Sequence, residues 1–251
     1  MQIQLIRSAT LRLTYAGKTL LIDPMLDSKD ARPPVINTPN DRRNPLVELP
    51  LPIDDIVADL DALLVTHLHQ DHLDETAIAR LDTTLPLIGQ PDDVDRLTAH
   101  GFTTLLPVDD TRVWEGITIT RTPAQHGTGE IAVAMAPVSG FVLSAPDEPT
   151  LYLAGDTIWY EEVGRAIAAY RPDVIVVNGS GARFTVGDPI TMTAEDIAEV
   201  QRAAPLATIV VDHLEAINHC LETRDAIAER LTALDARDRV LLPQDGETLT
   251  F

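Results

Sequence analysis

The first 23 residues alternate polar and apolar positions, a pattern typical of half-buried β-strands. Gln2–Ile6 and Leu11–Tyr15 carry this alternation, and a turn at Ala16-Gly17-Lys18 leads into the more apolar run Thr19–Asp23. Strands joined by such short connections predict an antiparallel meander. Residues 27–53 follow with six prolines and little periodicity. This composition predicts a long surface loop inserted into the fold.

The rest of the chain alternates apolar runs with helical patterns. Strands are predicted at Ala62–Val65, Leu85–Gly89, Val113–Glu115, Ile117–Thr122, Ala136–Ser144, Thr150–Ala154, Asp173–Val177, Thr208–His213, Arg239–Pro243 and Glu247–Phe251. Helices are predicted at Asp74–Leu81, Pro91–His100, Tyr160–Tyr170, Thr193–Ala203 and Leu221–Leu234. Asp74 and Thr193 stand at N-cap positions, and Asp196 completes a capping box with Thr193. This order of elements indicates an α/β fold.

The charge of the chain limits its partners. The sequence has 39 acidic and 19 basic residues, so its formal net charge is −20. Such a field repels phosphate backbones, and no cluster of Lys and Arg offsets it. We therefore expect a small-molecule substrate and no nucleic acid partner. The sequence is compatible with a homo-oligomer.

The number of cysteines and the hydropathy of the chain exclude further classes of protein. Cys220 is the only cysteine, which excludes an intrachain disulfide and a cage of thiolate ligands around a metal. The chain begins without a basic segment followed by a long apolar run, and no stretch approaches 18 apolar residues. We therefore expect a cytoplasmic protein that does not associate with membranes.

The stretch Thr66–His72 concentrates three imidazoles and one carboxylate directly after a buried strand. Because side chains at i and i+2 of an extended segment point the same way, His67 and His69 can reach one metal ion together. If the chain then turns, Asp71 and His72 are directed to a second position close by. Imidazole and carboxylate ligands suit Zn²⁺ or Mn²⁺, and Fe²⁺ fits the same donors. The stretch predicts a metal site.

Other candidate ligands also follow predicted strands. His126 precedes two glycines that allow the backbone to approach a ligand closely. Asp156 follows Gly155 at the end of an apolar run, where a carboxylate can either bridge two cations or cap the next helix. Asp23 ends the third strand, where it can either orient a ligating histidine or cap a loop. His100 ends a helix away from these signals and is assigned a structural role.

This constellation of His-x-His-x-Asp-His, strand-end His, Gly-Asp and strand-end His resembles the metallo-β-lactamase superfamily of metal-dependent hydrolases. The stretches Leu21–Pro24, Tyr152–Thr157 and Pro172–Asn178 resemble its ascorbate-6-phosphate-lactonase-like branch. The resemblance covers nearly the whole chain. It implies a single domain, residues 1–251, folded as a four-layer αββα sandwich with two mixed β-sheets between helices.

The resemblance also implies the roles of individual residues. It places His67, His69 and His126 on a first metal ion. It places Asp71, His72 and His213 on a second, with Asp156 bridging the two ions. His219 is the alternative to His213 as the last ligand. Otherwise it contacts the substrate or is structural.

The expected activity is hydrolysis by a metal-bound hydroxide. Two divalent cations lower the pKa of a shared water and stabilise the developing oxyanion. Asp71 and His219 are the candidate catalytic residues, Asp71 by orienting the nucleophile or relaying a proton. A small ester or lactone is the leading substrate class, and a small cyclic or sugar phosphate is the alternative. A non-catalytic metal-binding regulatory module is the alternative outside enzymes. Pocket walls are expected from residues 26–52 and 178–192, where Arg183 either binds an anion or lies on the surface.

Overall fold

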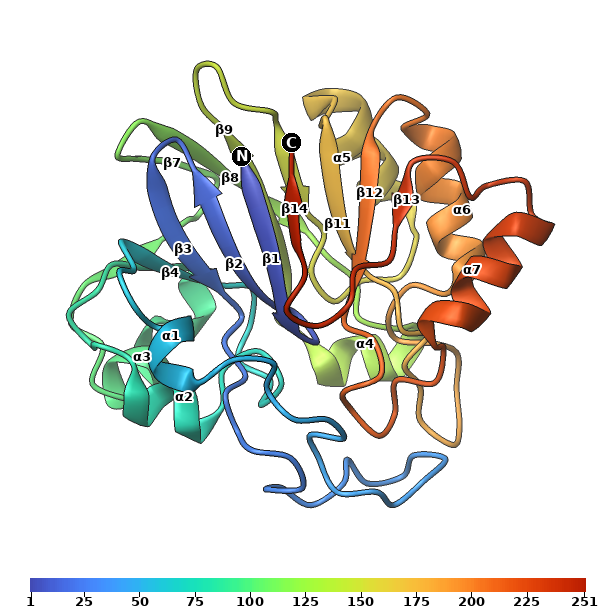
Figure 1. The fold of residues 1–251 in the computed structure, drawn as a ribbon, viewed down its shortest axis with the longest axis horizontal. Helices are drawn as coiled ribbons and strands as arrows, with labels where there is room; N and C mark the ends of the chain where they lie inside the picture. The colour runs from blue at the N-terminus through green and yellow to red at the C-terminus, as the bar shows by residue number, and fades with distance from the viewer.

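Two seven-stranded β-sheets pack face to face at the centre of the structure, a computed structural model that describes residues 1–251 (Figure 1). The first sheet has the strand order β14 (Thr248–Thr250), β1 (Gln2–Arg7), β2 (Thr10–Tyr15), β3 (Lys18–Ile22), β4 (Ala62–Val65), β5 (Leu87–Gly89) and β6 (Leu105–Pro107). The second has the order β13 (Val240–Leu241), β12 (Thr208–Asp212), β11 (Val174–Asn178), β10 (Leu151–Leu153), β9 (Ser139–Ser144), β8 (Ile117–Pro123) and β7 (Thr111–Trp114).

Both sheets are mixed. In the first, β14, β1, β2 and β3 pair antiparallel, as the predicted meander requires, and β3 to β6 pair parallel. In the second, β10 to β13 pair parallel, and β7 to β10 pair antiparallel. Because β3 and β4 are parallel, their carboxyl ends lie at the same edge of the first sheet. The carboxyl ends of β10, β11 and β12 likewise lie at one edge of the second sheet.

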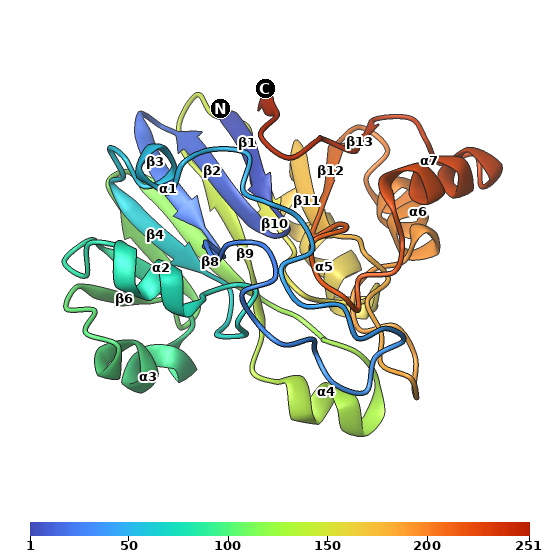
Figure 2. The same ribbon diagram turned by 60° about the horizontal axis from the view of Figure 1, so that its bottom comes forward.

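Helices cover the outer face of each sheet (Figures 1 and 2). The first sheet is covered by α1 (Ile53–Ile56), α2 (Glu75–Arg80) and α3 (Val94–Ala99), the last preceded by a 3₁₀ turn at Pro91–Asp93. The second sheet is covered by α5 (Glu161–Tyr170), α6 (Ala194–Ala203) and α7 (Arg224–Ala233). This arrangement confirms the predicted four-layer αββα sandwich. No helix of the structure has the length and apolar character needed to cross a bilayer.

The strands that read as continuous apolar runs are buried on both faces. In β4, Leu64 packs between the two sheets, whereas Leu63 packs under the helices of the first sheet. In β11, Val176 faces the other sheet and Val177 faces the helices of the second sheet. Because side chains alternate across a strand, a strand between two layers needs apolar residues at every position.

Residues 27–52, here called the strap, contain no helix or strand beyond an isolated bridge between Arg32 and Asn44. This confirms the predicted irregular segment. In Figure 2 the strap runs beneath the sheets toward α4 (Gly129–Met135) and toward the loops that precede α6 and α7. These segments surround the carboxyl ends of the central strands.

Two helical predictions need correction. The helix predicted at Leu221–Leu234 begins at Arg224, because the Thr223 side chain accepts a hydrogen bond from Ala226 N and caps the first turn. Leu221 precedes the helix and is exposed. Helix α4 was not predicted, since it has only 7 residues and its apolar contact is limited to the partly buried Ile131 and Met135, which is too short a pattern to give a periodic signal.

Other predicted boundaries shift by a few residues. The run Ala136–Ser144 forms a strand only from Ser139, after Pro137. The segment Pro91–His100 divides into the 3₁₀ turn and α3. The N-caps Asp74 and Thr193 are confirmed, and Thr193 forms the capping box with Asp196.

Candidate metal centre and substrate cavity

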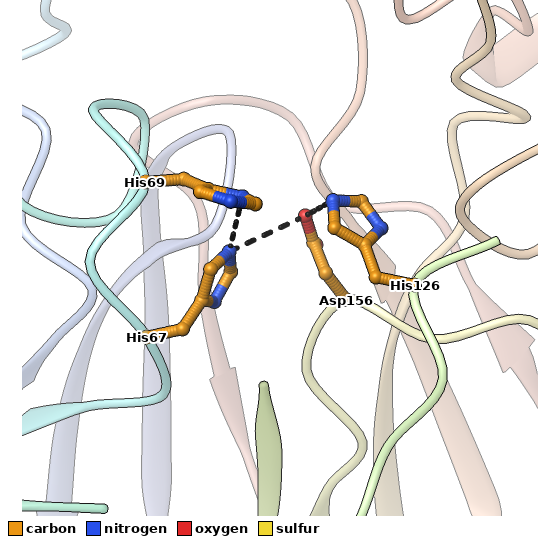
Figure 3. Close-up of side chains that lie close together, drawn as sticks. All are labelled: His67, His69, His126 and Asp156. Atoms are coloured by element: carbon orange, nitrogen blue, oxygen red, sulfur yellow. Dashed lines mark hydrogen bonds and ion pairs between the residues drawn. The ribbon is translucent and has the colours of Figure 1, made fainter. Parts of the chain in front are cut away.

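His67, His69, His126 and Asp156 form a first cluster between the two sheets (Figure 3). One potential ligand atom from each lies within 4.8 Å of the others. His67 Nε2 is 2.8 Å from His69 Nδ1, and Asp156 Oδ2 is 3.2 Å from His126 Nε2. Imidazole nitrogens and a carboxylate oxygen thus converge on one point, which is the geometry of a metal site.

In three of these side chains, the polar atom that faces away from the cluster is held by a hydrogen bond to a neighbouring residue. His67 Nδ1 lies 3.0 Å from Thr66 Oγ1, and His126 Nδ1 lies 2.7 Å from the backbone oxygen of Ile190. These contacts leave the other ring nitrogen of each histidine free to face the cluster. Asp156 Oδ1 accepts a 2.6 Å hydrogen bond from Asn178 Nδ2, so its Oδ2 is directed at the imidazoles.

Asp71, His72 and His213 form a second cluster beside the first. Asp71 Oδ2 is 3.3 Å from His213 Nε2, and Asp156 Oδ2 is 3.3 Å from His72 Nε2. Asp156 also places Oδ1 3.8 Å from His213 Nε2. It therefore lies between the two clusters, as the bridging role requires.

The backbone conformation at the ends of two strands orients side chains in and next to the second cluster. Asp23 directly follows β3 with φ +45°, and His213 directly follows β12 with φ +60°. A left-handed conformation is uncommon for residues other than glycine and is concentrated at functional sites. Asp23 Oδ2 lies 2.8 Å from His72 Nδ1, which confirms that this carboxylate contacts a predicted ligand. Asp71 and His72 are redirected by a tight turn, in which His72 N donates to His69 O.

The donor set fits divalent cations. His72 Nε2 and His213 Nε2 are buried and have no hydrogen-bond partner. Burial lowers the pKa of His67 well below its usual value and that of His69 to about 4, so both rings are neutral and have a free lone pair. Burial alone would raise the pKa of Asp156, but the facing imidazoles of His72 and His213 hold it well below its usual range. Buried orphan nitrogens around an ionised carboxylate are what a bound cation would satisfy.

A cavity of about 310 Å³ opens onto the clusters through His69, Asp71 and His126. Its other lining residues are Arg32, Pro33, Pro34, Val35 and Asn44 of the strap, Gln70, Met135 of α4, Phe184, Ile217 and His219. The strap and residues 178–192 were the predicted walls, and both contribute. Helix α4 completes the cavity and was not predicted to do so. The segment of residues 213–222, here called the 213–222 loop, contributes Ile217 and His219, of which His219 was predicted to contact the substrate if it is not a ligand.

The structure separates the two candidates for the last ligand. His213 lies in the second cluster, whereas His219 lines the cavity outside both clusters. His219 Nδ1 is buried without a hydrogen-bond partner, and the ring stacks on Phe184 with centroids 6.4 Å apart. Burial lowers the pKa of His219 to about 4, so its ring is neutral.

The structure also decides between the alternative roles of several other residues. Arg183 does not line the cavity, and its Nε donates to the backbone oxygen of Gly181. Asp156 does not cap α5, whose N-cap is Tyr160. His100 is exposed at the end of α3. Asn178, which orients Asp156, was not singled out as a site residue, because an Asn before a Gly-Ser-Gly turn is also typical of a plain loop.

Comparisons with known proteins agree with this geometry. A family model described as a beta-lactamase superfamily domain matches residues 18–214. The UPF0173 protein YddR of Bacillus subtilis is 40% identical over 255 residues, with all of both chains covered. A UPF0173 metal-dependent hydrolase of Xanthobacter autotrophicus is 28% identical, with 81% of this chain and 79% of that protein covered.

The chain belongs to the UPF0173 family of the metallo-β-lactamase superfamily. It is a metal-dependent hydrolase with a dinuclear-type His/Asp site. Among solved structures, an isothiocyanate hydrolase from Delia radicum gut bacteria is 36% identical to this UPF0173 protein. Its TM-score is 0.95, and the match covers 100% of this chain and 99% of that one.

Proposed function

We propose that this UPF0173 hydrolase adds water to an electrophilic carbon of a small, uncharged substrate, and that an isothiocyanate is its substrate class. The composition of the cavity carries the proposal. Val35, Met135, Phe184 and Ile217 supply apolar walls next to the clusters. Such walls favour an apolar substituent over a charged one.

The single guanidinium in the cavity is already neutralised. Arg32 Nε lies 2.6 Å from Asp27 Oδ2, and Arg32 Nη1 donates to the backbone oxygen of Gln70. No lysine and no other arginine lines the cavity. Arg32 Nη2 has no hydrogen-bond partner, so a phosphate group would have to compete with Asp27 for this one guanidinium. This charge distribution disfavours the phosphodiesterase alternative and the lactone of a sugar phosphate.

Similarity to the isothiocyanate hydrolase supports the choice of electrophile. In this reaction the oxygen of water bonds to the central carbon of the N=C=S group, and a proton moves to the nitrogen. The second proton of the resulting thiocarbamic acid then moves to the nitrogen as the carbon–nitrogen bond breaks, and an amine and carbonyl sulfide are released. A small neutral ester or lactone presents the same kind of electrophilic carbon and is the second candidate, favoured by the same apolar walls.

The residues of the chain have distinct parts in this reaction. When bound, two divalent cations supply Lewis acidity and lower the pKa of a water molecule at the site. Asp71 reaches the cavity surface, where its carboxylate accepts a hydrogen bond from the attacking water and orients it. His219 lines the cavity, and in the tautomer that carries a proton on Nε2, the ring nitrogen that is not fully buried, it donates a hydrogen bond to the substrate heteroatom on which negative charge develops. The apolar walls exclude other water.

A matched pair of substrates tests the proposal. Phenyl isothiocyanate and 4-carboxyphenyl isothiocyanate differ by one charge, and the released amine reports turnover of either. We expect kcat/KM for the neutral compound to be at least about tenfold higher, which corresponds to about 1.4 kcal/mol. Phenyl acetate and bis(p-nitrophenyl)phosphate extend the panel. Faster turnover of the phosphodiester, or equal turnover of the charged and neutral isothiocyanates, would overturn the proposal.

A further inference from the structure

We propose that Asn218 is the positioning residue of the substrate cavity, because its side chain fastens the strap to the 213–222 loop. Residues from both segments line the cavity: Val35 and Asn44 from the strap, and Ile217 and His219 from the loop. Asn218 lies between the two lining residues of the loop. It is itself only 1% exposed and does not line the cavity.

Every polar atom of the Asn218 side chain is used. Its Oδ1 accepts from Val35 N at 3.0 Å and from Asn44 Nδ2 at 2.8 Å. Its Nδ2 donates to Thr38 Oγ1 at 2.7 Å, to the backbone oxygen of Asn40 at 2.9 Å and to that of Val35 at 3.2 Å. One amide therefore holds four positions of the strap.

The backbone of Asn218 is fastened to the same residues. Its N–H donates to Asn44 Oδ1 at 2.8 Å, and its carbonyl oxygen accepts from Asn40 Nδ2 at 2.5 Å. Beside these bonds, Leu46 N donates to the backbone oxygen of Ala216. Since the strap has no strand or helix of its own, this network takes the place that a β-ladder takes elsewhere in the fold.

The network sets both sides of the cavity at once. On one side it fixes the backbone of Val35, whose side chain forms part of the apolar wall. On the other it fixes the chain next to His219, whose Nδ1 has no hydrogen-bond partner of its own. A buried network of this kind loses more than one bond when its central member is removed, because several donors and acceptors are left unsatisfied together.

This inference rests on the proposed function only for its kinetic part, so the test has a structural part that does not need turnover. Hydrogen–deuterium exchange is compared between the wild-type protein and Asn218→Ala, with Asn40→Ala as the matched control. The control removes the two bonds of the Asn40 side chain, to the Asn218 carbonyl oxygen and from Arg42 N, and keeps all five bonds of the Asn218 side chain. We expect exchange in residues 33–44 to rise at least about tenfold in Asn218→Ala and by less than about threefold in the control. Exchange in the strands should stay unchanged.

The kinetic part of the test distinguishes a role of Asn218 in positioning the cavity from a role in stability alone. With phenyl isothiocyanate, Asn218→Ala should raise KM at least about tenfold with kcat within about threefold and the metal content unchanged. Faster exchange with an unchanged KM would overturn the role in the cavity, and unchanged exchange would overturn the proposal as a whole. Thr38→Val removes the acceptor of one of the five side-chain bonds and leaves Asn218 itself in place, so it should give intermediate changes, and it replaces Asn218→Ala as the deciding variant if that protein does not fold. Absence of isothiocyanate turnover in the wild type would refute the proposed function and leave the exchange test in force.

Discussion

The floor of the site and its wall are built from different kinds of structure. The floor, meaning the seven His and Asp side chains of the two clusters, lies on segments that directly follow strands β4, β8, β10 and β12. The wall, meaning the strap, α4, residues 179–192 and residues 214–222 of the 213–222 loop, contains no strand. Its position depends on hydrogen bonds between side chains and loops, such as those of Asn218.

This difference indicates how the fold divides its tasks. The backbone ladders of two sheets hold the segments that carry the floor, although His126 also depends on the backbone oxygen of Ile190 in the wall. The wall can change its residues without disturbing a strand, and we expect it to select the substrate. Variants of the floor should therefore affect metal binding and all activity. Variants of the wall should affect the affinity for substrate and leave the metal in place.

The largest effect is expected from a floor histidine. His67→Ala removes a buried nitrogen of the first cluster. We expect kcat/KM to fall at least about 1,000-fold, a loss of about 4 kcal/mol, because the metal chemistry depends on this cluster. The matched control is His100→Ala, which truncates an exposed histidine on α3 and should keep wild-type kinetics. Full turnover in His67→Ala would place the chemistry elsewhere.

A smaller effect is expected one contact away from the floor. Asp23→Asn keeps the shape of the side chain but weakens its contact with His72 Nδ1. Loss of such a supporting carboxylate typically weakens metal affinity 10- to 100-fold. Competition with a fluorescent chelator measures this change directly. Asp147→Asn, at an exposed turn with φ +62°, is the control. If both variants retained metal equally well, Asp23 would have no role in metal binding.

His219 tests where the floor ends and the wall begins. Because His219 lies outside both clusters, His219→Ala should keep the metal content of the wild type. We expect kcat to fall about tenfold through loss of the hydrogen bond to the substrate heteroatom, which corresponds to about 1.4 kcal/mol. Metal analysis and steady-state kinetics on the same sample check both statements. Loss of metal from this variant would instead identify His219 as a ligand.

The smallest effect is expected from the apolar wall. Phe184→Ala removes a ring that lines the cavity and stacks on His219. We expect KM for phenyl isothiocyanate to rise about tenfold or less, with metal content unchanged. Val186→Ala on the same segment is the control, since Val186 is 79% exposed and does not line the cavity. Equal KM values for the two variants would show that the substrate does not bind against this wall.

The same difference explains what could be predicted from the sequence. Strands such as β4 and β11 lie between two layers, so their unbroken apolar runs identify them. His67, His69 and His126 stand at strand ends, and residues at such ends meet when the sheets pack. The fold and the members of both clusters could therefore be predicted from the sequence. The structure places all seven of these side chains in the two clusters.

The wall of the site could be predicted from the sequence only in part. Residues 26–52 and 178–192 were identified as walls, but their side-chain contacts depend on loop conformation. An asparagine between two predicted elements is typical of a surface loop, so the sequence gives no sign that Asn218 is buried. Its side chain becomes buried only because the strap folds over it. The choice between His213 and His219 likewise depends on backbone geometry, because both follow the same strand and lie six residues apart.

We expect the floor to hold two metal ions on which all hydrolysis depends. The most direct measurement strips the protein with a chelator and returns Zn²⁺ or Mn²⁺ in steps. Bound metal is counted by mass spectrometry, and phenyl isothiocyanate turnover is followed on the same samples. We expect no turnover in the stripped protein, saturation at two ions per chain, and full activity only when both ions are bound. Turnover that survives complete removal of metal, or binding that saturates without restoring any hydrolysis, would contradict this expectation.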